Sequence, residues 1–144
     1  MKSIGFAAAA FIAGLAISLV IGDLIDFVKF SAARISGAYI ISKAQKSAAA
    51  GNFLQAQKEY ERALTKISPS NKKLLAKTKN NLALCVFLPA EQNQNRKEMF
   101  KSVLIFQEAL ELFKELGAAQ SVKEVEINIK EAQTAIDNLT LTDG

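Results

Sequence analysis

The sequence contains no histidine, and that absence excludes several kinds of catalytic and metal-binding site. Without histidine there is no Ser-His-Asp or Cys-His catalytic arrangement, no histidine-ligated zinc and no imidazole pH switch. The single cysteine, Cys85, excludes an internal disulfide and leaves the redox compartment open. There is also no glycine-rich phosphate loop and no cluster of metal-ligating residues, so we expect no enzymatic activity, no cofactor and no metal.

Residues that interrupt helices are scarce. The 144 residues include only two prolines and seven glycines, and most of the remainder consists of good helix formers. No segment alternates polar and apolar residues as a half-buried strand would. The sequence therefore predicts an all-α protein with one domain, or a small domain with an appendage.

Residues 4–22 form a run of nineteen residues without a charge. As a helix rising about 1.5 Å per residue, this run would be about 28 Å long, close to the ~30 Å hydrocarbon core of a bilayer. We therefore favour a single transmembrane helix that contacts the lipid bilayer through residues 4–22. The alternatives are a cleaved signal peptide and a buried helix of a soluble domain.

Basic residues are more numerous after this run than before it. Only Lys2 and the amino terminus precede it, whereas Lys29 and Arg34 follow closely. Cytoplasmic flanks are enriched in such residues, so we expect a single-pass membrane protein whose C-terminal domain faces the cytoplasm or stroma. The expected organisation is a transmembrane anchor and juxtamembrane helix (1–30), a helical domain (31–138) and a flexible tail (139–144).

Turn and capping signals divide the chain after the anchor into five expected helices. Ser68 followed by Pro69 is typical of an N-cap and the first helical position. Pro89 is expected to stop the third helix at Leu88, and residues 90–97 to form a polar loop. The expected helices cover about residues 31–50, 52–67, 69–88, 95–116 and 121–138.

The last two helices have signals of their own. Gly117 is a candidate for the C′ position that ends the fourth helix. Ser121 and Glu124 have the spacing of a capping box and therefore predict the start of the fifth helix.

A short sequence pattern recurs with a period of 46 to 47 residues. The matched pairs are Tyr60-x-x-Ala63-Leu64 with Phe106-x-x-Ala109-Leu110, and Asn81-Leu82 with Asn128-Ile129. A repeat of helix pairs at such a period predicts a short solenoid, in which each unit buries its apolar face against the next.

The first repeat resembles the tetratricopeptide repeat (TPR) family, which combines a small residue, a glycine turn, A-x3-Y-x2-A-L and a proline. Its matching residues are Ala44, Gly51-Asn52-Phe53, Ala56, Tyr60, Ala63-Leu64 and Pro69. The second unit, around Phe106, matches more loosely, and the last helix resembles a capping half-repeat. The resemblance covers roughly residues 37–138. It implies antiparallel helix hairpins stacked around a concave groove that binds peptides or proteins.

If the resemblance holds, polar residues of the inner helices point toward that groove. Amide side chains can both donate to and accept from an extended peptide backbone, although solvated helix positions are an equally good explanation. The candidate groove residues are Ser42, Gln45, Asn80, Asn81 and Asn128.

Charge is distributed unevenly between the two parts of the chain. Residues 1–90 carry 12 basic and 4 acidic residues, a net charge of +8, whereas residues 91–144 carry 6 and 10, a net charge of −4. A basic patch without acidic residues could contact anionic lipid headgroups or an acidic protein, or be a solvated face. Nucleic acid is not expected, because no aromatic residues interleave with it. The basic patch consists of Arg62, Lys66, Lys72, Lys73, Lys77 and Lys79.

Together these features predict a membrane-anchored, TPR-like scaffold or adaptor for protein–protein interaction. Its partner is expected to belong to a membrane complex, whose assembly the chain would assist. The alternative is a permanent, non-catalytic structural subunit of a large membrane complex. A small-molecule binder or enzyme is a third and less favoured interpretation.

Overall fold

The computed structural model describes residues 36–142, so the anchor expected at residues 4–22 lies outside the described part. Five helices and no strand occur within residues 36–142, which confirms the all-α class and the expected number of helices there. Among these residues, no helix combines the length and apolar composition needed to cross a bilayer. The helices are residues 36–49, α2 (Phe53–Leu64), α3 (Lys72–Gln92), α4 (Arg96–Glu115) and α5 (Ala119–Thr142).

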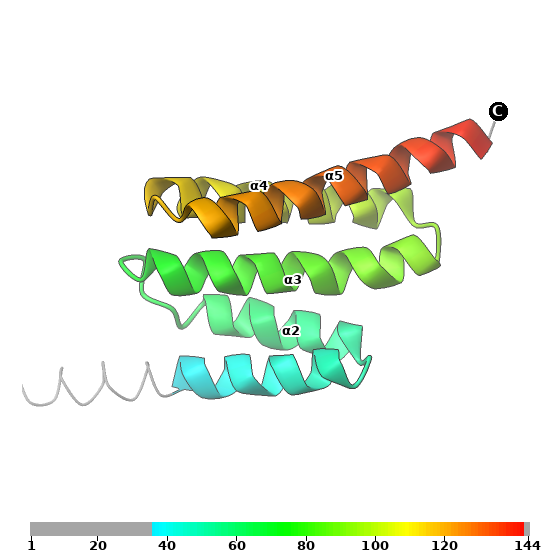
Figure 1. Cartoon of the computed structure of the whole chain (residues 1–144). Helices are drawn as coiled ribbons and strands as arrows, with labels where there is room; N and C mark the ends of the chain where they lie inside the picture. Colours follow the sequence, from blue (N-terminus) through cyan, green and yellow to red (C-terminus); the bar gives the residue numbers. More distant parts are fainter. Residues whose placement is uncertain (1–35, 143–144) are drawn as a thin grey trace, which may run out of the picture. The chain divides into compact units, whose positions relative to one another are not determined.

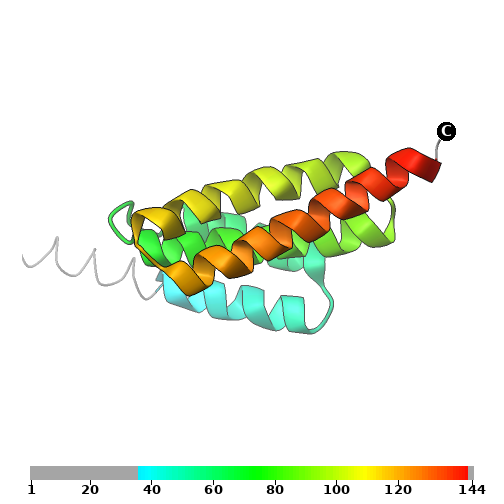
Figure 2. The same cartoon turned by 45° about the horizontal axis from the view of Figure 1, so that its top comes forward.

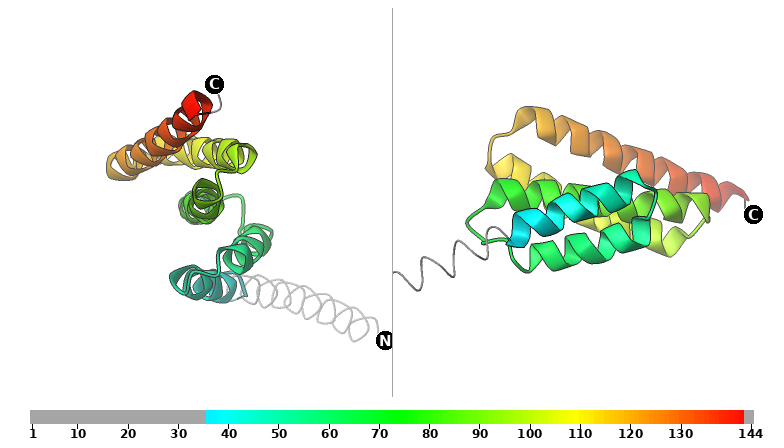
Figure 3. Two further views of the ribbon diagram at one scale, coloured as in Figure 1. Left: turned by 90° about the vertical axis from the view of Figure 1, so that its right-hand side faces the viewer. Right: turned by 90° about the horizontal axis from the view of Figure 1, so that it is seen from below.

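The five helices form a stack of antiparallel hairpins (Figure 1). Helix 36–49 pairs with α2, α3 pairs with α4, and α5 packs against α4 (Figure 2). Seen end on, α3 lies between the first hairpin and α4 (Figure 3). Helix 36–49, α3 and α5 run in one direction, and α2 and α4 run in the other. This arrangement is consistent with the helical repeat that the period of 46 to 47 residues predicts.

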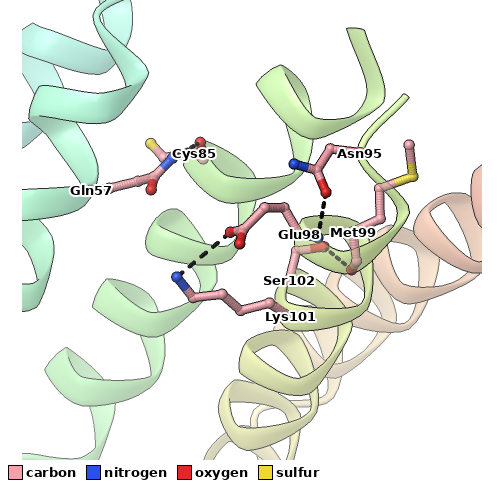
Figure 4. A network of polar contacts seen from close by, with 7 residues as sticks. All are labelled: Gln57, Cys85, Asn95, Glu98, Met99, Lys101 and Ser102. Atoms are coloured by element: carbon pink, nitrogen blue, oxygen red, sulfur yellow. Dashed lines mark hydrogen bonds and ion pairs between the residues drawn. The ribbon is translucent and has the colours of Figure 1, made fainter. Parts of the chain in front are cut away.

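Helices α2 and α4 each bury an aromatic side chain between two small residues. Tyr60 of α2 is buried between Ala56 and Ala63, four residues before it and three after. Phe106 of α4 has the same arrangement with Ser102 and Ala109. The small residues let the neighbouring helices come close, while the ring fills the space between them. The buried Ser102 hydroxyl has a hydrogen-bond partner in the core, because it donates to the Met99 carbonyl at 2.6 Å (Figure 4).

Helix α3 does not stop at Leu88, as the sequence predicts, but continues through Pro89 to Gln92. A proline inside a helix has no N–H to donate to the carbonyl four residues earlier, here that of Cys85. In the folded domain Gln57 of α2 replaces the missing donor, because its Nε2 donates to the Cys85 oxygen at 2.7 Å (Figure 4). A side chain of the first hairpin therefore stabilises the proline-containing turn of α3.

Replacing Gln57 with leucine is expected to lower the free energy of unfolding by about 1–3 kcal/mol, because the Cys85 carbonyl then loses its donor. The same change should cost less in a Pro89→Ala background, where the backbone N–H of residue 89 can take that carbonyl. A double-mutant cycle from urea denaturation should give a coupling energy of at least about 0.5 kcal/mol. Additive effects of the two changes would contradict this explanation.

The start of α3 also differs from the prediction. Its N-cap is Asn71, whose Oδ1 accepts a hydrogen bond from the Leu74 N–H at 3.2 Å. Ser68 instead closes a turn before the helix, because its carbonyl accepts from the Asn71 N–H at 2.9 Å and its hydroxyl bonds to Ser70. Pro69 is therefore a turn residue and not the first residue of the helix.

The polar loop expected over residues 90–97 is shorter in the structure. Ala90 is buried in the α3–α4 core, so the helix continues past it to Gln92. The connection is confined to residues 93–95, with Gln94 at a φ of 53°. Asn95 then caps α4 by accepting from the Glu98 N–H at 3.2 Å (Figure 4).

Gly117 has the predicted C′ role, with a φ of 63°. Its N–H donates to the Lys114 carbonyl at 3.0 Å, and the Ala118 N–H donates to the Phe113 carbonyl at 3.0 Å, which is a Schellman motif. This tight reversal lets α5 begin at Ala119, so the capping box predicted at Ser121 is wrong. Helix α5 runs through Thr142 and so extends into the stretch predicted as a tail.

Candidate functional site

Two pockets lie on either side of Leu88 in α3, and Leu88 lines both of them. The first pocket is formed by helix 36–49, α2 and α3, and the second lies between α3 and α5. We call the two pockets together the α3 groove. Every helix within residues 36–142 except α4 contributes residues to these two pockets.

The first pocket has a volume of about 360 Å³ and mostly apolar walls. Asn81, Leu84 and Leu88 are spaced three and four residues apart on α3, so they share one face of that helix. Gln45 and Asn81 place amide groups beside this apolar surface. The lining residues are Gln45, Ala48, Phe53, Tyr60, Asn81, Leu84, Cys85 and Leu88.

The two titratable residues of the first pocket are not reactive groups. Burial raises the pKa of the Cys85 thiol to about 11, so it stays protonated at neutral pH and is not an activated nucleophile. Burial also raises the pKa of Tyr60, and a hydrogen bond from Asn81 partly opposes that rise. Both side chains therefore act as neutral parts of the wall.

The second pocket is larger, at about 590 Å³, and both apolar residues and charged residues line it. Ile127 of α5 is 57% exposed and Leu88 is 37% exposed, so two large apolar side chains face solvent here. Exposed aliphatic groups beside a pocket are a typical feature of a protein-binding surface. The lining residues are Phe87, Leu88, Glu91, Ile127, Lys130, Glu131, Thr134, Ala135 and Asn138.

The candidate groove residues from the sequence divide into three groups. Gln45 and Asn81 line the first pocket. Asn80 and Asn128 lie outside both pockets, where the Asn128 Nδ2 donates to the Asn80 Oδ1 at 3.2 Å and joins α5 to α3. Ser42 is exposed on helix 36–49 and lines neither pocket.

Sequence reasoning missed the apolar residues of the groove. Leu84 and Leu88 follow the helical spacing of α3 and look like core positions in the sequence. Ile127 carried a weak signal, since it lies between the polar residues Glu126 and Asn128, and Val125 already fills the core at that turn. An apolar residue off the buried stripe is a candidate contact residue.

The basic patch is partly neutralised by α4. Lys72 Nζ lies 2.7 Å from the Glu115 carboxylate, and Lys79 forms an ion pair with Glu108. Both carboxylates come from the acidic second part of the chain, whereas both lysines come from the basic first part. The uneven charge distribution along the sequence therefore provides ion pairs between α3 and α4. The other four basic residues have no ion pair within residues 36–142.

The first hairpin also holds a buried carboxylate, Glu59, which is 5% exposed. Ser47 Oγ and Gln55 Nε2 each donate to it at 2.9 Å, and Lys43 Nζ lies 3.2 Å away. The hydrogen bond from Gln55 is the largest contribution that lowers the pKa of Glu59, despite the opposing effect of burial. Within the described part of the chain, no group of three or more acidic or cysteine side chains could hold a metal ion. Because Ser47 and Lys43 belong to helix 36–49, their contacts with Glu59 link that helix to α2.

This link is expected to depend on pH. The folded pKa of Glu59 lies below its ordinary value, so its contribution to stability is present above the unfolded pKa and is lost as the pH falls through the folded pKa. Between about pH 6 and pH 3, the urea midpoint should fall more steeply for the native protein than for Glu59→Gln. The control is Glu61→Gln, an exposed position on the same helix. Parallel profiles for the native protein and Glu59→Gln would contradict the assignment.

No protein-family model, curated protein or solved structure matched this chain when it was compared with them. The likeness to the TPR family rests on the sequence pattern described above and stays a prediction.

Proposed function

We propose that this chain is a membrane-anchored, TPR-like adaptor whose α3 groove binds a segment of a partner protein. The observation that carries the proposal is the pair of pockets that share Leu88, with exposed apolar side chains and amides on their walls. Such a surface offers burial for apolar side chains and hydrogen bonds for a peptide backbone. The pocket residues offer no activated nucleophile, which favours binding over catalysis.

The chemistry of the walls describes the partner segment. Leu84, Leu88 and Ile127 would contact apolar side chains. Gln45 and Asn81 could bond to backbone N–H and C=O groups, since an amide both donates and accepts. Lys130 and Glu131 at the second pocket would select against a segment with a strong charge of one sign. An apolar segment with few charges fits best, as expected for a subunit of a membrane complex.

The anchor part of the proposal rests on the uncharged run at residues 4–22. Deleting residues 1–22 is expected to move the protein from the membrane fraction to the soluble fraction. The measurement is sedimentation of membranes after an alkaline carbonate wash, which removes peripheral proteins and leaves spanning ones. If the shortened protein still sediments with washed membranes, the anchor is wrong.

A permanent structural subunit is the second candidate, and one observation favours it. Phe100 and Leu104 of α4 are 49% and 61% exposed and lie outside the α3 groove. Apolar groups on a second surface suit a protein that contacts several neighbours at once. This candidate predicts that the chain is always found at equal stoichiometry with the other subunits.

A further inference from the structure

Four cations of the basic patch lack a partner within the described residues. Lys72 and Lys79 are paired with carboxylates of α4. The four others are exposed, and no ion pair neutralises them within residues 36–142. We call this set the free cations: Arg62, Lys66, Lys73 and Lys77.

The free cations gather at one end of the hairpin stack. Arg62 is in the last turn of α2, Lys66 follows that helix, and Lys73 and Lys77 lie in the first two turns of α3. The connection over residues 65–71 joins the two groups, at the left in Figure 1. None of the four lines either pocket of the α3 groove.

The described domain begins at the same end. A Cβ atom built on Gly37 would lie 3.8 Å from the Lys66 Cβ, so the first turn of helix 36–49 lies beside the free cations. Only residues 23–35 separate this turn from the expected anchor. Even fully extended, these residues reach at most about 45 Å, which limits how far this end can lie from the membrane.

The placement of these cations is unfavourable within the domain itself. Lys73 and Lys77 are a like-charged pair at a spacing of four residues on α3, and such pairs repel along a helix. The first turn of α3 contains Lys72 and Lys73 and no acidic residue, so these charges oppose the helix dipole. An anionic surface outside the domain would relieve both effects.

We propose that the free cations contact the anionic lipid headgroups of the bilayer that holds residues 4–22. The proposal rests on the anchor described under the proposed function and adds the orientation of the domain. The connection 65–71 then faces the membrane, and the pockets of the α3 groove remain available for a partner. A bilayer fits better than an acidic protein, because the cations lie outside the groove and beside the start of the tethered domain.

The test uses the full chain in lipid nanodiscs of phosphatidylcholine, with or without about 30% phosphatidylserine. Lysines are acetylated for short times and quantified one by one by mass spectrometry. Lys66, Lys73 and Lys77 are expected to react about three-fold more slowly on the anionic discs, and about 1 M salt should remove the difference. Lys46 near the end of helix 36–49, and Lys97 and Lys101 in the first two turns of α4, lie toward the other end and should react equally on both kinds of disc.

A variant pair tests whether the charges themselves produce this contact. Hydrogen exchange over residues 65–71 should slow on anionic discs for the native chain. The same slowing is expected for the control K46Q/R96Q/K97Q/K101Q, whose positions lie toward the other end and line neither pocket of the α3 groove. The slowing should be lost for R62Q/K66Q/K73Q/K77Q. Because all eight positions are exposed, both variants should keep the native far-ultraviolet circular dichroism.

The outcomes separate this inference from the proposed function. If the chain co-purifies with both kinds of disc but its lysines react equally, the lipid contact is wrong and the anchor stands. If the chain does not co-purify with discs at all, the anchor is wrong and the lipid contact falls with it. If protection arises only after proteins of the native membrane are added, the free cations bind an acidic protein and the lipid contact is again wrong.

Discussion

Replacing Phe106 with alanine is expected to lower the free energy of unfolding by about 3–5 kcal/mol. The ring is fully buried in the core formed by α3, α4 and α5. Its small neighbours Ser102 and Ala109 cannot extend into the space that the ring would leave, so a cavity would remain. The measurement is urea denaturation of a fragment covering residues 31–144, followed by circular dichroism.

The matched control is Phe100→Ala on the same helix. Phe100 is 49% exposed, and its ring lies 5.5 Å from the Arg96 guanidinium carbon. Removing it should cost about 1 kcal/mol, from partial burial and a weak cation–π contact. Equal losses for the two variants would mean that the repeated small–aromatic–small arrangement does not form the core.

Replacing Ile127 with glutamate is expected to weaken partner binding by more than about ten-fold. The change places a carboxylate at the second pocket, where a bound apolar segment would have to desolvate it without a counter-charge of its own. Because Ile127 is already 57% exposed, the free energy of unfolding should change little. The readout is the amount of partner recovered with the chain from detergent extracts.

The control for this variant is Leu104→Glu. Leu104 is 61% exposed on α4, so the chemical change and the exposure are closely matched, but it lines neither pocket of the α3 groove. The adaptor hypothesis predicts normal recovery of the partner with Leu104→Glu. If Leu104→Glu loses the partner and Ile127→Glu keeps it, the binding surface is on α4 and the groove assignment fails.

The sequence predicts the parts of this fold that depend on local pattern. Tyr60 and Phe106, with small residues at fixed spacing around them, indicate the two central positions of the core, and both rings are buried. Gly117 indicates the end of α4 because few other residues adopt a positive φ without cost. Such signals lie within one turn of the chain, and they need no information about neighbouring helices.

The errors arise where a tertiary contact overrides a local rule. Pro89 disfavours a helix because it leaves the Cys85 carbonyl without its usual donor and its ring crowds that carbonyl. Gln57, 28 residues away from Cys85, supplies the missing donor. Ser68 and Asn71 are both good capping residues, and the turn over residues 68–71 decides between them. The spacing of residues along the chain predicts neither the hydrogen bond from Gln57 nor the turn over residues 68–71.

The candidate site was predicted only in part for a related reason. Polarity suggested Gln45 and Asn81, which line the first pocket, and equally suggested Asn80 and Asn128, which bond to each other. The apolar residues Leu84 and Leu88 could not be told from core positions, because a groove is defined by helices that meet in space, and Ile127 carried only a weak signal. Only the burial of each side chain in the folded domain distinguishes an apolar groove residue from an apolar core residue.

The most direct test of the adaptor hypothesis is extraction of native membranes in mild detergent, native gel separation and mass spectrometry of the co-migrating proteins. The hypothesis predicts that the chain migrates in small amounts with partly assembled complexes, and that Ile127→Glu removes it from them while Leu104→Glu does not. Migration at equal stoichiometry in one complete complex, unaffected by Ile127→Glu, would contradict the adaptor and support a permanent structural subunit.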